Sequence, residues 1–401
     1  MRLATANTFD ASIATLQRRQ QQLQTVQQQL TSGKKVSQAS DDPTGAARAE
    51  RAQTAIGKID ANQRALEASR NGMTLSEGAL GDANEMLQQV RESMVAAGNA
   101  SYSDAERAGL ANKIAGLRAQ MLSIANRPDG AGGYLFAGQG SGAAPFLDQA
   151  NGVSFNGVPG TASTGSIESF PLTVDGRQAW EQARSGNGSF VTAPDASAAT
   201  PPKGWIDAGR VTNPALLTGN PYEIQITGTA PAAQSWTITN SASGASATGA
   251  YQSGKSIEFE GMAVAVSNAP VDGDRFTIQP STNGLKVFDV LDGLVNQLRT
   301  PNRSGAAITQ SNISGLRDLD AVMGNLQSVR SQIGEGLNNL DGSEARMAAL
   351  KQYSRSEKSA AEDLDMVSGI SDFQNQQTGY ETALKTYAMV QRLSLFQYIN
   401  V

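Results

Sequence analysis

The 401-residue chain contains no cysteine and no histidine. The absence of cysteine excludes disulfides, thiolate nucleophiles and cysteine-bound zinc. The absence of histidine removes the commonest general base and the commonest metal ligand, and it excludes a Ser-His-Asp triad. Catalysis by paired carboxylates is the route that remains open. We expect a protein that is not an enzyme and that holds no cofactor and no metal, although composition alone does not exclude a pair of catalytic acids.

A strong charge of one sign and long apolar runs are also missing. The chain has 32 Lys and Arg against 37 Asp and Glu, a formal net charge of -5. It therefore offers no electrostatic reason to bind nucleic acid or an anionic membrane. No run of about 18 apolar residues could span a membrane, and residues 1–13 lack the apolar stretch of a secretory signal. Composition alone favours a cytoplasmic protein, but this inference fails for substrates of an export apparatus that cleaves no signal.

The N-terminal segment carries an apolar residue at every seventh position. The row consists of Phe9, Leu16, Leu23 and Leu30, with Val26 as a companion. Such a row forms the narrow apolar seam of a coiled-coil helix. One helix cannot bury this seam by itself, so we expect a partner helix from this chain or from another subunit. A disordered tail rich in glutamine over residues 17–29 is the alternative for the free monomer, and both descriptions can hold in different states.

A second long helix is predicted to begin at Asp42-Pro43, where Asp42 caps the helix and Pro43 takes its first position. Gly72, Gly78 and Gly81 predict a local kink or break. Its heptad seam is Ile59, Leu66, Met73, Leu80, Leu87 and Met94. A third helix opens with a capping box formed by Ser103 and Glu106, and it ends at Pro128.

The middle of the chain changes character. Residues 132–283 are rich in Gly, Ser, Thr and Pro, and apolar residues alternate with polar ones, which predicts an antiparallel β domain with one buried face. Helical periodicity returns after Leu285, with a break at Thr300-Pro301. The later seam is Leu316, Leu319, Met323, Leu326, Ile333, Leu337 and Leu340.

These patterns predict an α+β chain: an elongated antiparallel helical bundle or coiled coil formed by both chain ends, with an inserted antiparallel β domain. We expect a terminal coiled-coil assembly domain from residues 1–40 and 358–401. Residues 41–147 and 284–357 would form a helical bundle domain with a small β-hairpin region, and residues 148–283 a β-rich outer domain. The predicted assembly interface is Phe9, Leu16, Leu23, Val26, Leu30, Ile370, Phe373, Tyr380, Leu384, Tyr387, Leu393, Leu395 and Phe396.

The acidic residues have structural explanations. Asp272-Gly273-Asp274 lacks the later ligands of a calcium loop and is interpreted as a turn, and Asp41-Asp42 as a helix cap. A secreted hydrolase or adhesin built on the β domain is the alternative from a different class. It would need a pair of acids or a sugar-binding surface among Asp207, Glu223, Glu258 and Glu260.

Several segments resemble the flagellin family. Residues 29–36, with Ser40-Asp41-Asp42-Pro43 after them, resemble its N-terminal signature, and residues 87–92 resemble a helix of its first packed domain. Other motifs resemble the hook-associated junction proteins of this family more than the flagellins. These are the proline at position 43, residues 132–138 with Pro145-Phe146, residues 273–278, and the ending at residues 393–398. The resemblance covers both helical ends, about two thirds of the chain.

The resemblance implies a structural component of the bacterial flagellum, an adaptor between hook and filament that serves cell motility. Such proteins are secreted unfolded through the flagellar type III export apparatus, with help from an export chaperone, and they act outside the cell. The expected partners are copies of the same chain in a ring, the adjacent junction protein FlgK and flagellin. Within the family, a flagellin or FlgK itself is the alternative, and the number of subunits per cell separates a scarce ring protein from an abundant flagellin.

Overall fold

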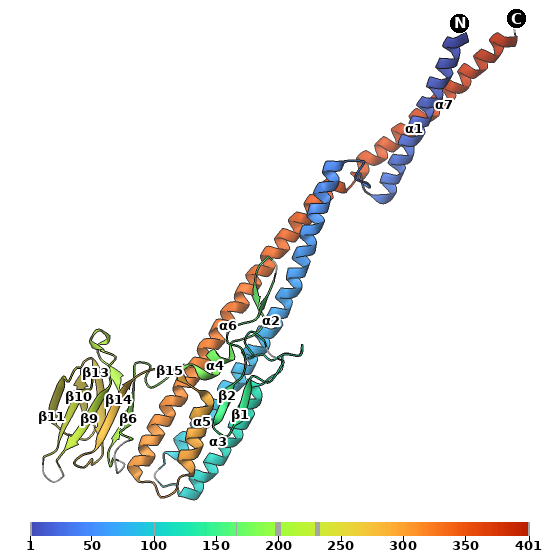
Figure 1. The fold of residues 1–401 in the computed structure, drawn as a ribbon. Helices are drawn as coiled ribbons and strands as arrows, with labels where there is room; N and C mark the ends of the chain where they lie inside the picture. Colours follow the sequence, from blue (N-terminus) through green and yellow to red (C-terminus); the bar gives the residue numbers. More distant parts are fainter. Residues whose placement is uncertain are drawn as a thin grey trace. The chain divides into compact units, whose positions relative to one another are not determined.

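A computed structural model describes residues 2–99, 101–140, 142–165, 167–196, 202–228 and 233–399, and side-chain surroundings within residues 10–390. The chain divides into two compact units, residues 1–64 with 343–401 and residues 65–342. Within the described ranges, no helix is long and apolar enough to cross a membrane. The predicted α+β class, with helical chain ends around an antiparallel β region, is confirmed (Figure 1).

The first unit is helical. It contains α1 (Arg2–Ser32), α7 (Met366–Ile399), the beginning of α2 (Pro43–Ala97) and the end of α6 (Gly305–Glu362). Helices α1 and α7 lie side by side, and the two chain termini lie at the same end of this pair (Figure 1). The pair therefore joins segments that stand at opposite ends of the sequence.

The core of the second unit is built on the rest of α2 and α6, with α3 (Asp104–Ala125) and α5 (Val287–Arg299). The seam of α2 packs against residues of α6 such as Leu319 and Leu326. Burying a stripe of this kind on a second helix supplies most of the stability of a long helix. Each predicted seam residue of α2 is buried, namely Ile59, Leu66, Met73, Leu80, Leu87 and Met94.

The predicted break in α2 is wrong, because the helix runs without interruption from Pro43 to Ala97. Gly72 instead permits a close approach. A Cβ at this position would lie 2.6 Å from the carbonyl oxygen of Leu172, so a larger residue would push the neighbouring loop away. Ser69 donates a hydrogen bond to the adjacent carbonyl of Pro171. Here glycine marks the place where a loop contacts the helix.

The capping box of α3 is confirmed. The Ser103 N–H donates to the Glu106 carboxylate at 2.7 Å, and the Glu106 N–H donates to the Ser103 hydroxyl at 3.3 Å. Because the ionised carboxylate accepts bonds from the N–H and the hydroxyl of Ser103, the pKa of Glu106 is lowered.

An arginine joins three elements of the second unit. Arg118 of α3 makes two hydrogen bonds, of 2.7 and 2.8 Å, to Asp148 of β1 (Phe146–Gln149), and it contacts Asp292 of α5 at 2.6 Å. Its guanidinium also lies 5.9 Å from the ring centre of Phe288. These bonds lower the pKa of Asp148. Forked carboxylate pairs fix geometry as well as energy, so Arg118 sets the position of the β1 hairpin on the helices.

Aromatic side chains fill the space under this hairpin. Trp180 of α4 (Gly176–Glu181) is fully buried and stacks on Phe288 with ring centres 5.8 Å apart. Phe136 and Phe146 meet the same indole edge-on. These rings form one aromatic cluster at the place where helices α4 and α5 meet the β1 hairpin.

The β domain consists of two antiparallel sheets around a core of its own. One sheet has the order β11-β10-β9-β14-β6, and the other has β12-β13-β7, with β8 also paired to β13. The larger sheet is built from β6 (Phe190–Pro194), β9 (Tyr222–Thr227), β10 (Ser235–Asn240), β11 (Ser246–Ala250) and β14 (Arg275–Pro280). The smaller sheet is built from β7 (Trp205–Ile206), β8 (Arg210–Val211), β12 (Ser256–Phe259) and β13 (Met262–Ser267).

Short elements connect the β domain to the helices. They are the antiparallel pairs β1 with β2 (Gly152–Phe155), β3 (Ser163–Thr164) with β4 (Phe170–Pro171), and β5 (Ala183–Arg184) with β15 (Asn283–Leu285), and the 3-10 turn Pro214–Leu216. Two direct bonds hold the β domain on α6: Ile206 N–H to Gln310 Oε1 at 2.8 Å, and Arg317 Nη1 to the carbonyl of Thr192 at 2.8 Å.

Two leucines of α2 test the seam. Leu80 is 0% exposed and Leu75 is 39% exposed. We expect Leu80→Ala to lower the free energy of unfolding by about 2–5 kcal/mol, because the cavity left in the helical core cannot be refilled. Leu75→Ala, the matched control, should change it by only about 0.5 kcal/mol. Urea unfolding followed by circular dichroism measures both, and equal shifts would show that the seam is not the core.

Candidate assembly surface

Helices α1 and α7 form an antiparallel pair. Arg19 lies opposite Gly379, and Leu30 lies opposite Gly369. The side chains between the helices recur at spacings of three and four residues, the geometry of a coiled coil. The half-buried set is Ser12, Leu16, Arg19, Leu23, Val26 and Leu30 on α1, and Phe373, Gln376, Gly379, Tyr380, Ala383 and Tyr387 on α7.

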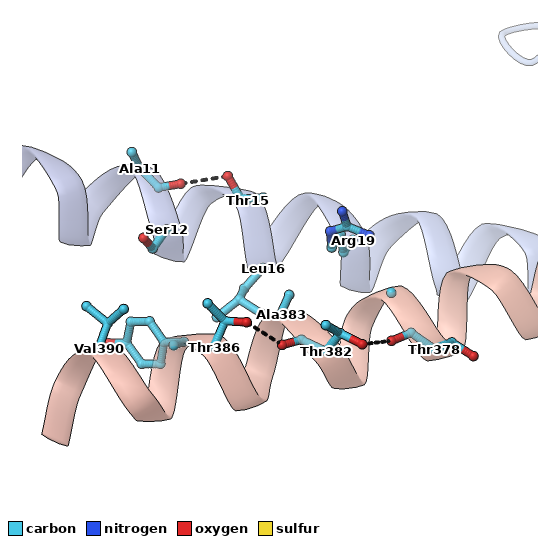
Figure 2. A pocket seen from close by; sticks show the side chains of 12 residues that line it. Ala11, Ser12, Thr15, Leu16, Arg19, Thr378, Thr382, Ala383, Thr386 and Val390 are labelled. Carbon is cyan, nitrogen blue, oxygen red and sulfur yellow. Dashed lines mark hydrogen bonds between the residues drawn. The ribbon is translucent and has the colours of Figure 1, made fainter. Parts of the chain in front are cut away.

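In the half of this pair that lies nearer the chain termini, side chains do not fill the space between the helices. A groove of about 570 Å³ runs between the two helices, and Figure 2 shows Leu16 of α1 beside Ala383 of α7 within it. The hydroxyls of Thr378, Thr382 and Thr386 do not bridge the helices. Thr382 and Thr386 instead donate at 2.8 and 2.9 Å to the carbonyl four residues earlier in their own helix. Apolar contact across the groove is therefore sparse.

The two helix interruptions of the first unit are bonded to each other. Gly33 ends α1 with a φ of 70°, a conformation that favours glycine. The Lys35 N–H donates to the carbonyl of Glu362 at 2.8 Å, and the Leu364 N–H donates to the carbonyl of Gly33 at 2.9 Å. Lys34 also pairs with Glu362 at 3.2 Å. We call residues 33–42 with 362–365 the joint. Here α1 gives way to α2, and α6 gives way to α7.

An aspartate starts each helix that leaves the joint. Asp42 accepts the Thr44 N–H at 3.0 Å before α2, as predicted, and Asp365 accepts the Val367 N–H at 3.0 Å before α7. These caps satisfy N–H groups that have no acceptor within the helix. Bonds from the Gly45 N–H and the Val367 N–H, respectively, are the main cause of the lowered pKa of Asp42 and Asp365.

Helix α7 exposes large apolar side chains outside the α1–α7 seam. Val367 is 80% exposed, Ile370 is 47% exposed and Leu384 is 41% exposed. Met366 and Met389 are exposed as well, and so is Ile13 on α1. Single exposed apolar residues are ordinary, but a series of them on one helix marks a surface that another chain can cover.

The predicted interface residues divide into three groups. Leu16, Leu23, Val26, Leu30, Phe373, Tyr380 and Tyr387 come together in the α1–α7 seam, and Ile370 and Leu384 face outward. The side chains of Phe9, Leu393, Leu395 and Phe396 lie outside the described residues. Contact of any of these residues with another subunit stays a prediction.

The sequence reasoning missed Gly379, Gln376 and Ala383. The row Phe373, Tyr380 and Tyr387 forms one side of the seam. The other side is formed by residues three positions after a member of this row, and not by those four positions after it. Counting by three would have found Gln376 and Ala383. A search for apolar residues selected Ile370 and Leu384 in their place.

Three of the four acids of the alternative function, Asp207, Glu223 and Glu260, have structural partners. Asp207 accepts backbone N–H groups of Gly209 and Ala265, and Glu223 pairs with Arg275 at 2.8 Å. Glu260 accepts from the Tyr222 hydroxyl at 2.7 Å. In the part of the chain that the structure describes, no three acidic side chains gather closely enough to hold a metal ion. This arrangement gives the hydrolase hypothesis no support.

Comparison with protein families matches residues 5–141 to the bacterial flagellin N-terminal helical region. Over 409 residues the chain is 24% identical to the flagellar hook-associated protein 3 of Escherichia coli (strain K12), an alignment that covers 99% of both chains. Over 205 residues it is 31% identical to the flagellar hook-associated protein 3 of Salmonella typhimurium (strain LT2), covering 49% of this chain and 61% of that protein. The chain therefore carries the flagellin N-terminal helical region over residues 5–141, and it is similar to hook-associated protein 3 over its whole length.

Solved structures extend this similarity to the fold. The flagellar junction protein FlgL from Legionella pneumophila superimposes with a TM-score of 0.69 at 27% identity, covering 79% of this chain and 100% of that one. FlgL from Xanthomonas campestris gives a TM-score of 0.66 at 28% identity, covering 76% and 99%. By name, these relatives are flagellar hook-associated and junction proteins. The fold of this chain and its sequence are therefore both similar to hook-associated protein 3 (FlgL).

The contact between α1 and α7 can be tested in the unassembled chain. Leu23 is half-buried in the seam, while the neighbouring Gln24 is exposed. We expect Leu23→Asp to separate the two helices, because it removes an apolar side chain from the seam and a half-buried carboxylate is costly to desolvate. Limited proteolysis should then cut residues 10–32 several-fold faster than in the unsubstituted chain. Gln24→Asp is the control, and equal cleavage of the two variants would contradict this pairing.

The caps of the joint predict an acid sensitivity. Because the pKa of Asp42 and of Asp365 is lowered in the folded chain, each contributes stability above its ordinary pKa of about 3.9, and this is lost as pH falls through the folded pKa. The double variant Asp42→Asn with Asp365→Asn keeps an acceptor but cannot titrate. Its melting temperature should fall less than that of the unsubstituted chain between about pH 5 and about pH 2. Parallel curves would show that protonation of these two carboxylates does not cause the loss of stability in acid.

Proposed function

We propose that this chain is a structural adaptor at the junction between the flagellar hook and the filament. The observation that carries the proposal is the terminal pair of helices, which supplies a slender seam and leaves Val367, Ile370 and Leu384 exposed. Two helices bury too little surface to be robust alone. Contact with neighbouring subunits would cover these side chains and complete the pair. The likeness to FlgL structures and to hook-associated protein 3 supports the same role.

The proposed partners follow from this position. Copies of the chain would form a ring, with the junction protein FlgK on the hook side and flagellin on the filament side. The residues of the predicted interface would supply the contacts, with α1 and α7 lining the inner tube and the β domain facing solvent. The chain would reach this extracellular position through the flagellar type III export apparatus, accompanied by an export chaperone. The role needs no catalysis, cofactor, metal, nucleic acid or membrane.

A motility assay tests the role and its surface together. A strain that lacks the chain should build hooks, shed flagellin into the medium and fail to swim, because filament subunits have no platform. The unsubstituted chain should restore swimming. The variant Ile370→Asp with Leu384→Asp should not restore it, because buried carboxylates oppose subunit contact. Both residues are exposed in the α1–α7 pair, so the variant should still fold.

Asn375→Asp is the matched control, because Asn375 is exposed and lies five residues after Ile370, on another face of α7, and it should restore swimming fully. Export of each variant is measured in the medium, which separates failed assembly from failed secretion. Normal filaments in the strain without the chain would overturn the junction role. Full rescue by the doubly substituted variant would leave the role in place but remove this surface from it.

A further inference from the structure

A pocket of about 540 Å³ opens at the start of α6, within the second unit. Three parts of the sequence surround it: the α2–α3 region, the first turn of α6 and the edge of the β domain. Its polar lining consists of Arg107, Lys203, Asn268, Ser304 and Thr309, with Trp205 beside them. All of its lining residues belong to the second unit, and none to the terminal helices α1 and α7.

Arg107 is buried in this lining without a counter-ion. The residue is only 7% exposed, and its Nε and Nη1 atoms have no hydrogen-bond partner among the described residues. Leaving a buried charge unpaired is costly, and folded proteins almost always pair it. An arginine in this state is therefore a donor set that awaits an acceptor.

The carboxylates nearby are already engaged. Glu106 accepts from Ser103 in the capping box, and Asp104 accepts the Asn302 N–H at 3.0 Å. Asp274 accepts the backbone N–H groups of Lys203 and Val271, each at 3.0 Å. Glu106 attracts Arg107 from its exposed position, but it forms no ion pair with it among the described residues.

A second arginine adds positive charge. Arg303 donates to the carbonyls of Gln297 and Ala307, at 3.2 and 2.6 Å, and pairs with no carboxylate in the described chain. Burial, and then repulsion by Arg107, lower its pKa. Arg303 does not line this pocket itself, but its positive charge and that of Arg107 oppose each other.

The remaining groups also suit an anion. Helix α6 begins at Gly305, beside the capping Ser304, whose hydroxyl accepts the Ala307 N–H at 3.2 Å. The N-terminus of a helix carries partial positive charge. Lys203 is exposed at the rim and forms no ion pair in the described chain, and Asn268 holds its carbonyl at 2.7 Å.

We propose that this pocket binds a small oxyanion through Arg107, Lys203 and the first turn of α6. The ligand chemistry is a phosphate or carboxylate group that accepts charge-assisted hydrogen bonds from the guanidinium. Two sources carry that chemistry, a free phosphate in solution and the carboxylate side chain of a neighbouring subunit. Binding neutralises the repulsion between the two arginines and ties the edge of the β domain to the helices.

Calorimetric titration of the full-length protein with inorganic phosphate, at constant ionic strength set by sodium chloride, tests the proposal. We expect saturable binding that Arg107→Met weakens by about tenfold or more. Lys203→Met should weaken binding as well. Because Lys203 is exposed, this variant should fold, and it tests the pocket even if Arg107→Met does not fold. Lys255→Met, at another exposed lysine of the β domain, is the control and should bind as the unsubstituted chain does.

Titration with acetate separates the two sources. Binding of acetate that depends on Arg107 and Lys203 supports the side chain of a neighbouring subunit. Binding of phosphate alone supports a free phosphate. The proposal is overturned if neither anion binds saturably, or if phosphate affinity is the same in Lys203→Met and Lys255→Met.

Discussion

The heptad seam of α2 is the constraint on which the second unit depends, since one helix cannot bury its own stripe. Its partner is α6, so a helix from the first quarter of the sequence must pack against a helix from the last quarter. Ion pairs border this contact: Glu77 with Arg330 at 2.5 Å, Arg91 with Asp320 at 2.8 Å, and Arg70 with Asp341 at 2.6 Å. Partly exposed pairs of this kind contribute about 0–1 kcal/mol each. Their effect is to select one register among the several that a repeating seam allows.

Much of the fold could be predicted because it depends on local chemistry. The row from Ile59 to Met94, the capping box at Ser103 and the Asp42 cap each act within a few residues of the chain. The role of Gly72 could not be predicted, since a glycine in a helix has the same sequence signal whether it breaks the helix or admits a loop. Only the position of Leu172, a hundred residues later, distinguishes the two.

The candidate site was predictable in part for a related reason. Hydrophobicity identifies the large residues of a seam, such as Leu23 and Tyr380, but not the small ones. Gly379 and Ala383 occupy the seam because α1 comes close there, and closeness is a property of the pair. Arg107 shows the opposite limit. On a helix pattern an arginine indicates a solvated face, and its burial depends on the β domain covering it.

The contact between Arg19 and Gly379 also determines when structure can form. A chain that emerges from its N-terminus presents α1 first, and the partner of α1 is almost the last segment to follow. Closing a longer loop adds little entropy cost, since that cost grows only with the logarithm of its length. The consequence is kinetic, because α1 must wait until α7 has emerged before the two helices can pair. Throughout this wait, the apolar row of α1 stays open to any other helix within reach, so the order of emergence itself favours partners that are already in place.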